Sequence, residues 1–290
     1  MQYLRSLLLV CLIVTSGSCF GQHAKVIGAY NAFKLENAAV TLLKTGDSLS
    51  LTDAIRLEDN GRLYFVYDHT SIGVIHGKGS GQVQHLLTNK LQYLPYSAYY
   101  LEKFMLKRVY DFPSKAGYTA TSLMIPIQAD TVMVFEADNQ FYHNLDSFDI
   151  KQISITYPNW DTAAIPYRIH DNKINITFPL NEQVFNFSYS SESHRMVRDQ
   201  QKEMSLQKKL EDVRKEYINR LINNYLHQLV IMCVYAEEKY FGKAVETLEA
   251  YSPYRRREPV AVAMVDRFLM FSGFEVREDL MYKVLFTSGK

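Results

Sequence analysis

The sequence predicts a multi-domain α+β protein, in which β-rich domains come first and an α-helical region follows at the C-terminal end. Short apolar segments separated by Gly, Asn and Asp turns precede residue 193, a pattern typical of small barrels or sandwiches. After residue 193, apolar residues recur every three or four positions, as they do on one face of a helix. A third observation is an unbroken apolar run near the N-terminus, which fits neither pattern.

Residues 1–21 are predicted to be a secretory signal peptide. Arg5 supplies a positive charge, and the apolar run at 7–14 precedes small residues where a peptidase can cut. This run is shorter than the ~20 residues needed to cross a bilayer. Cleavage after Gly21 would send the protein to the periplasm, the cell surface or the extracellular space. A lipid anchor on Cys19 is the alternative, although the Leu usual three residues before such a Cys is replaced by Ser16.

The composition narrows the classes of protein to consider. Of the three cysteines only Cys233 follows the signal segment, so no intramolecular disulfide is expected. The 32 Lys and Arg residues nearly balance the 31 Asp and Glu residues, which argues against nucleic acid as a partner. No later apolar run is long enough for a transmembrane helix. Stability must therefore come from packed apolar cores, of which a chain this long can hold two or three.

Residues 22–122 are predicted to form the first β-rich domain. Asp59-Asn60-Gly61 is expected to make a hairpin turn into a strand at 63–67. The glycine-rich stretch 77–81 is also expected to be a hairpin turn, leading into a strand at 83–87. Apolar residues at mixed three- and four-residue spacing predict a helix near 97–110.

Part of this domain resembles the small β-domain of the FecR-like family. The resemblance covers about residues 35–87, where a strand, a Gly-Asp-x-Leu turn and an Asp-x-Ile segment precede a Gly-x-Leu strand. It implies a compact β-fold. The best-known members of that family are envelope-spanning signalling proteins with a membrane helix, and this chain lacks such a helix, so the signalling role is not carried over. The matching residues are Val40, Gly46-Asp47, Leu49, Asp53, Ile55 and Gly61-Arg62-Leu63.

Residues 123–192 are predicted to form a second β-domain, with Trp160 as a core aromatic. A reduced immunoglobulin-like sandwich is one interpretation, although the cysteine pair of true immunoglobulin domains is absent. The Phe185–Tyr189 stretch alternates apolar and polar residues, as a half-buried strand does. Strands are expected within 124–135, 148–156, 173–178 and 185–189.

Residues 193–290 are predicted to be helical throughout. Apolar residues from Leu206 to Leu229 keep helical spacing, which predicts one long amphipathic helix. A helical hairpin follows around 239–242, with a small Ala244 and then Leu248, and it resembles a tetratricopeptide-like repeat. A second helical pair is expected at 259–272 and 277–286. Such units do not bury their apolar faces singly, so this region must pack against other parts of the chain or a partner.

Few residues stand out as candidates for chemistry. His69, His76 and His85 lie near one another in the sequence, but their spacing matches no zinc motif, so no metal or cofactor is expected. No nucleophile elbow, zinc-protease helix or Cys-His arrangement occurs. The sharpest surface feature is Arg255-Arg256-Arg257, which could bind a carboxylate or phosphate surface and is the candidate partner-binding site.

Two functions remain open from the sequence. The favoured hypothesis is a non-enzymatic interaction or scaffold protein of the bacterial cell envelope, which binds a protein or peptide through its helical C-terminal region. The alternative is a carbohydrate-active or other hydrolase with a cleft between the β-domains. Glycosidic chemistry would need two carboxylates across such a cleft, for which Asp138, Asp146 and Asp149 are candidates.

Overall fold

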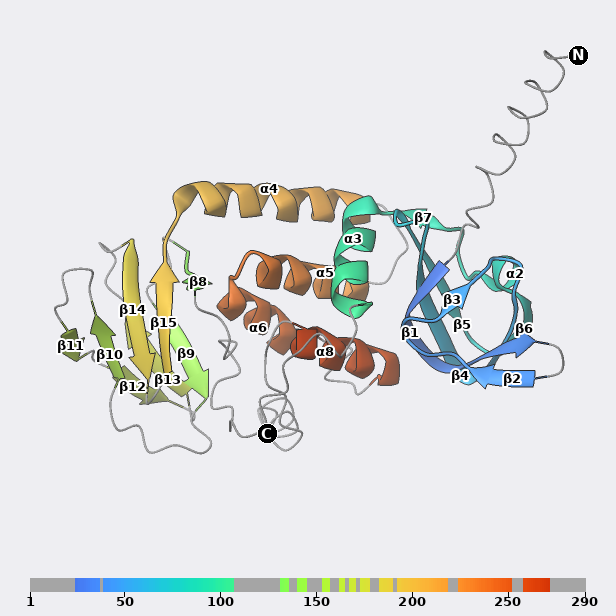
Figure 1. Ribbon diagram of the computed structural model, residues 1–290, viewed down its shortest axis with the longest axis horizontal. Coiled ribbons are helices and arrows are strands. Elements are labelled where there is room, and N and C mark those ends of the chain that lie inside the picture. The colour runs from blue at the N-terminus through green and yellow to red at the C-terminus, as the bar shows by residue number, and fades with distance from the viewer. Residues whose placement is uncertain are drawn as a thin grey trace, which may run out of the picture. The chain divides into compact units, whose positions relative to one another are not determined.

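The protein is an α+β structure, as the sequence predicted. In the computed structural model, strands form the N-terminal part and helices gather in the C-terminal part (Figure 1). The chain divides into two compact units, residues 1–95 and residues 96–290, which are described one at a time. The three-domain division expected from the sequence stays a prediction. The structure describes residues 24–36, 39–106, 131–135, 140–144, 153–156, 162–164, 167–170, 173–177, 183–189, 192–218, 224–251 and 258–271.

Seven described strands of the first unit form one antiparallel sheet. Its order is β2-β1-β4-β5-β7, with β3 also pairing with β1 and β6 with β4. Residues 83–86 form the short helix α2 (Val83–Leu86), so the strand predicted at 83–87 is wrong. The strands are β1 (Ala24–Glu36), β2 (Ala39–Leu42), β3 (Ser48–Leu49), β4 (Ala54–Tyr67), β5 (Ser71–His76), β6 (Gly79–Gln82) and β7 (Gln92–Tyr93).

The hairpin predicted at Asp59-Asn60-Gly61 is wrong, because these residues form a bulge inside the long strand β4. Leu57 pairs with Ala32 and Arg62 pairs with Tyr30, so residues 58–61 lie opposite Asn31 alone. The Asn31 side chain donates a hydrogen bond to the Asp59 carbonyl oxygen at 3.1 Å. A Cβ on Gly61 would lie 2.7 Å from the Leu57 Cβ, so the bulge requires glycine there.

The stretch 77–81 is likewise not a hairpin turn. β5 and β6 both pair with β4 and not with each other. The chain therefore bends between β5 and β6 and continues to pair with β4 beyond the bend. Gly77 makes the bend at φ 96° and donates to the Gly61 carbonyl at 3.0 Å. The bends of β4 and of the β5–β6 segment therefore lie side by side.

These bends fold the sheet over itself around one apolar core. Residues from both sides of the bend pack into the same buried cluster. The cluster comprises Ala24, Val26, Ala32, Leu43, Leu49, Ile55, Leu57, Leu63, Phe65, Ile75 and Val83.

The second unit begins with helix α3 and continues with two described sheets. The first has the order β11-β10-β14-β15-β8 and the second β12-β13-β9. β15 pairs with β14 through Val197, so the expectation that the chain turns helical after residue 193 is wrong. Trp160 lies outside the described residues, and the immunoglobulin-like interpretation stays a prediction. The strands are β8 (Thr131–Met133), β9 (Gln140–Asn144), β10 (Ile153–Thr156), β11 (Thr162–Ala164), β12 (Tyr167–His170), β13 (Lys173–Thr177), β14 (Val184–Tyr189) and β15 (Glu192–Val197).

Five described helices complete this unit. The single long helix predicted from Leu206 to Leu229 is two helices, because α4 ends at Tyr217 and Ile218 is extended at ψ 125°. Folding back lets α4 and α5 pack together, so that Leu210 and Leu229, for example, are both fully buried. The helix predicted near 97–110 is confirmed as far as Met105 by α3, and residues 107–110 lie outside the described residues. The bounds are α3 (Pro95–Met105), α4 (Gln200–Tyr217), α5 (Asn224–Glu237), α6 (Phe241–Glu249) and α8 (Pro259–Phe271).

The helical hairpin predicted around 239–242 is confirmed as α5 and α6. Lys239 ends α5 in the left-handed conformation at φ 66°, and Tyr240 donates to the Tyr235 carbonyl at 2.8 Å, as in a Schellman motif. Ala244 is fully buried, which lets the two helices approach closely. The likeness to a tetratricopeptide repeat stays a prediction, and residues 277–286 lie outside the described residues.

Candidate functional site

Several residues singled out from the sequence lie outside the described residues. Among them are Arg255-Arg256-Arg257, the signal segment with Cys19, and the carboxylates Asp138, Asp146 and Asp149. The arginine surface, the lipid anchor and the hydrolytic cleft therefore remain predictions from sequence alone.

The three histidines of the first unit are described, and the fold keeps two of them well apart. His69 lies in the turn before β5 with φ 55°, and His76 lies at the other end of that strand. His85 belongs to the short helix α2. Among the described residues, no group of three or more His, Cys, Asp or Glu side chains could hold a metal ion.

Cys233 has a structural environment. It lies in α5 and is completely buried, and burial raises the pKa of its thiol well above the ordinary value. Because the thiolate is the nucleophilic form, this environment makes the side chain inert in the folded protein. The thiol acts as a small apolar group in the helical core.

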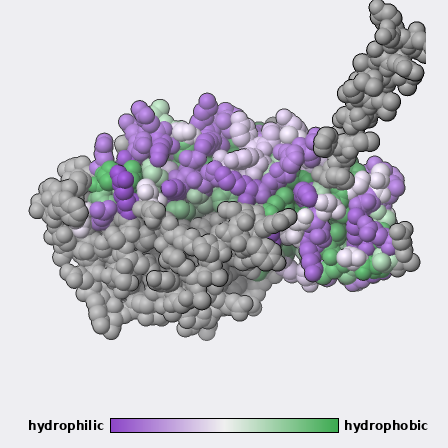
Figure 2. All heavy atoms as spheres, viewed as in Figure 1, coloured by the Kyte–Doolittle hydropathy of each residue, from purple (hydrophilic) through white to green (hydrophobic). Residues whose placement is uncertain are grey.

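Helix α4 has an exposed outer face. Asp199 begins this helix by accepting hydrogen bonds from the N–H groups of Gln201 and Lys202, at 3.0 and 3.1 Å. Leu206, Leu210 and Val213 on the inner face are fully buried. The opposite face is covered mostly by hydrophilic side chains, which are visible along the upper edge of Figure 2.

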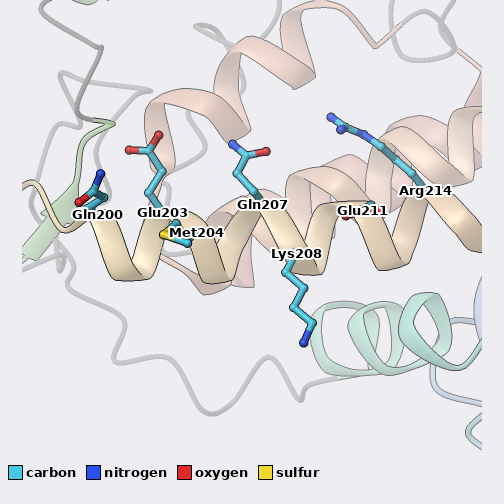
Figure 3. Close-up of a pocket in the computed structure, with 7 residues that line it drawn as sticks. All are labelled: Gln200, Glu203, Met204, Gln207, Lys208, Glu211 and Arg214. Carbon is cyan, nitrogen blue, oxygen red and sulfur yellow. The ribbon is translucent and has the colours of Figure 1, made fainter.

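A hollow of about 600 Å³ runs along this outer face. The described residues that line it all belong to α4, and five of them, Gln200, Met204, Gln207, Glu211 and Arg214, follow one another at spacings of four and three. This spacing places them on one stripe of the helix. Figure 3 shows the side chains of Glu203, Gln207 and Arg214 extending to the same side, with Lys208 pointing away. The lining residues, called the α4 stripe below, are Gln200, Glu203, Met204, Gln207, Lys208, Glu211 and Arg214.

The α4 stripe carries charges of both signs and one apolar side chain. Glu203 and Glu211 supply negative charge, and Lys208 and Arg214 supply positive charge. Met204, the apolar member of the stripe, is 69% exposed. A mixed-charge surface with one exposed methionine can bind a polypeptide of complementary pattern.

The position of α4 is fixed by a buried carboxylate that sequence analysis missed. Glu216 lies at the end of α4 and is 8% exposed. Its two oxygens accept hydrogen bonds from the N–H groups of Tyr96 and Ser97 at 2.8 and 3.0 Å, and from the Ser97 hydroxyl at 2.6 Å. The carboxylate therefore caps the N-terminus of α3, where negative charge is favoured. Ser97 is fully buried, so this polar cluster is a structural anchor and not a reaction site.

Two further contacts hold the helices around the stripe. The Lys209 ammonium forms an ion pair with Glu238 at the end of α5. The Arg267 guanidinium of α8 donates to the carbonyl of Met105 in the last turn of α3. α3 therefore has a carboxylate at its N-terminus and a cation at its C-terminus, both supplied by other helices. No local sequence signal marks Glu216 and Arg267 as the partners of α3, because each lies more than a hundred residues along the chain from the group that it binds.

Comparisons with known proteins find no relative: no family model, no curated protein and no solved structure matches this chain. Across the described ranges, none of the helices is both long and apolar enough to cross a membrane. The FecR-like and tetratricopeptide-like resemblances therefore rest on the residues that carry them.

Proposed function

We propose that the protein is a non-enzymatic interaction protein of the bacterial envelope, and that its helical region binds a helical segment of a partner protein along the α4 stripe. The observation that carries the proposal is the hollow along the exposed face of α4. The envelope location follows from the predicted signal peptide at 1–21.

The stripe favours a helical partner. Residues at spacings of four and three form the surface that one helix presents to another. The charges set the chemistry of the partner helix: acidic residues opposite Arg214, basic residues opposite Glu203 and an apolar side chain over Met204. Arg255-Arg256-Arg257, which precede α8 in the sequence, are proposed as an additional contact for acidic groups of the same partner.

The α4 stripe stands on a rigid support. Its inner face is buried, its first turn is capped by Asp199, and Glu216 ties its last turn to α3. A binding surface on a fixed helix loses little conformational entropy on association, because only its side chains become ordered. The alternative function, a hydrolase, rests on the sequence alone, because its candidate carboxylates lie outside the described residues.

Photocrosslinking tests the proposal in two steps. A benzophenone amino acid replaces Met204 in the full-length exported protein, and a matched variant carries it at Ser205, which is exposed on α4 outside the stripe. We expect one partner to crosslink at 204 and not at 205. Equal crosslinking at both positions, or none at 204, would contradict the proposal.

The captured partner is then purified and titrated. Arg214→Glu should weaken its binding by about tenfold, because it places like charges together. Lys202→Glu makes the same charge change on an exposed residue outside the stripe and should leave the affinity within about twofold. Equal weakening by both variants would mean that only net charge matters, and the α4 stripe would not be the binding surface.

A further inference from the structure

Strand β2 is an exposed edge strand of the first unit. It lies at the end of the sheet order, and among the described strands only β1 pairs with it. All four of its residues, Ala39 to Leu42, are exposed, and none is charged. Natural sheets usually protect such edges with charged residues, proline or a covering element. An uncharged, uncovered edge is therefore a surface on which another strand can pair.

The hydrogen-bond pattern identifies the free backbone groups. The Leu43 N–H donates to the Ala32 carbonyl at 2.9 Å, so residues 43 and 32 form a hydrogen-bonded pair. Such pairs alternate with non-bonded pairs along an antiparallel ladder. Thr41 therefore bonds to β1, whereas the N–H and C=O groups of Val40 and Leu42 point away from it. These outward groups lie symmetrically on either side of Thr41.

An apolar patch lies beside this edge. Leu42 is opposite Phe33 and Val40 is opposite Leu35, so the four side chains share one face of the β1–β2 pair. Val40 is 50% exposed and Leu42 is 48% exposed. Phe33 is partly covered by the Arg56 guanidinium, which lies 5.5 Å from its ring centre. The patch therefore continues to the free edge and ends there.

We infer that β2 pairs antiparallel with β2 of a second copy of this chain, around a twofold axis at Thr41. In this register Val40 of one copy lies opposite Leu42 of the other, and the outward N–H and C=O groups of both residues exchange hydrogen bonds. Directly opposite residues share a face, so the two apolar patches join into one. The pairing uses every outward backbone group of Val40 and Leu42.

A second copy fits this edge because the strand is complementary to itself. In a twofold contact the same strand supplies both sides, so a charged residue close to the axis would face the same charge on the second copy. β2 has no charge to repel its copy. The contact is short, so it falls at the small end of specific interfaces, and we expect a dimer that forms at micromolar or higher concentration.

A cysteine at the axis tests the register. In the chain from residue 22 to 290, Thr41→Cys places two thiols across a non-bonded pair, where Cα atoms lie about 4.5 Å apart and a disulfide can form. Cys233 is buried and does not compete. We expect the Thr41→Cys protein to become a covalent dimer under mild oxidation. The matched variant Ser80→Cys, at the exposed residue of strand β6, should stay monomeric.

Sedimentation of the chain without added cysteines provides the second measurement. The average mass should rise toward that of a dimer with concentration, and Leu42→Lys should abolish the rise, whereas Ser80→Lys should not. A chain that stays monomeric at a few hundred micromolar, together with equal crosslinking at 41 and 80, would overturn the inference. Because these residues belong to the first unit, the result is independent of the proposed α4 stripe.

Discussion

Helices α3 and α4 are both well formed, yet their ends are stabilised by opposite means. α4 is capped locally, because Asp199 is the residue directly before it and binds its first free N–H groups. α3 is preceded by Leu94, which has no side-chain oxygen to serve as a cap. Its N-terminus is capped instead by Glu216, and its C-terminal carbonyl of Met105 is bound by Arg267. The start of α4 is thus encoded beside it, whereas both ends of α3 depend on the folded bundle.

The largest effect should come from removing the distant cap of α3. Glu216→Ala leaves two backbone N–H groups and the Ser97 hydroxyl without their acceptor in a buried setting, and should lower the free energy of unfolding by about 3 kcal/mol. Urea denaturation monitored by circular dichroism measures this loss. Glu211→Ala removes an exposed carboxylate from the same helix and should change stability by less than about 0.5 kcal/mol. Equal effects would show that the buried cap is unimportant.

The opposite end of α3 provides the next comparison. Arg267→Ala removes a charged donor from the Met105 carbonyl and should cost about 2 kcal/mol, since hydrogen bonds from charged groups are stronger than neutral ones. Arg267→Lys keeps the charge but not the guanidinium geometry. Its free energy of unfolding should lie between those of the unaltered protein and Arg267→Ala. The same urea titration measures both variants. A lysine variant as unstable as the alanine variant would indicate that geometry, not charge, holds this end.

The local cap of α4 should matter less than the distant cap of α3. Asp199→Ala removes one exposed side-chain acceptor, and such caps contribute about 1 kcal/mol. Asp199→Asn keeps an acceptor oxygen and should recover most of the loss. Thermal unfolding of both variants tests this order. An Asp199→Ala loss larger than that of Glu216→Ala would reverse the comparison.

A stabilising change is expected where α5 ends. Lys239 has a positive φ of 66°, a conformation that glycine adopts without steric penalty. Lys239→Gly should therefore raise the free energy of unfolding by about 0.5–1 kcal/mol. Lys243→Gly, inside helix α6, is the matched control and should lower it by a similar amount. Urea denaturation of the two variants should show shifts of opposite sign.

The smallest expected effect is a pH dependence from His227, which lies in the first turn of α5. Burial, and to a lesser degree the charge of Arg214, lowers the pKa of His227 from its ordinary value of 6.5. The unfolded chain therefore binds a proton more readily than the folded one. The contribution of this group is complete above pH 6.5 and is lost as the pH falls below that value. His227→Gln should lose less stability between pH 7.5 and 5.5 than the unaltered protein, and an equal loss would contradict this assignment.

Local sequence patterns predicted some helices and strands correctly and gave wrong predictions for others. The α5–α6 hairpin was predicted because its turn and its small Ala244 lie within a few residues of each other. The continuous helix from 206 to 229 was wrong, because the apolar spacing continues across the break at Ile218. Asp59-Asn60-Gly61 has the composition of a hairpin turn, but its role was decided by Asn31, which belongs to another strand.

The candidate site was less predictable than the fold. The amphipathic pattern of α4 indicates an exposed face, but the hollow along it depends on how the helix packs. Glu216 looks like any other charged helix residue in the sequence, and only the tertiary structure places it under the N-terminus of α3. Long-range polar contacts of this kind leave no periodic signal, because each involves a single residue.

The burial of Cys233 makes its thiol a natural probe of local unfolding in the helical region. Once residues 1–21 are removed, Cys233 is the one cysteine that remains in the sequence. In the folded state its side chain is buried and does not contact solvent. A thiol reagent can modify it only after α5 separates from its neighbours. The rate of labelling, followed at several reagent concentrations, therefore reports how often this part of the molecule opens and how fast it closes again. The chain thus carries its own probe of local unfolding, and no label needs to be engineered to read it.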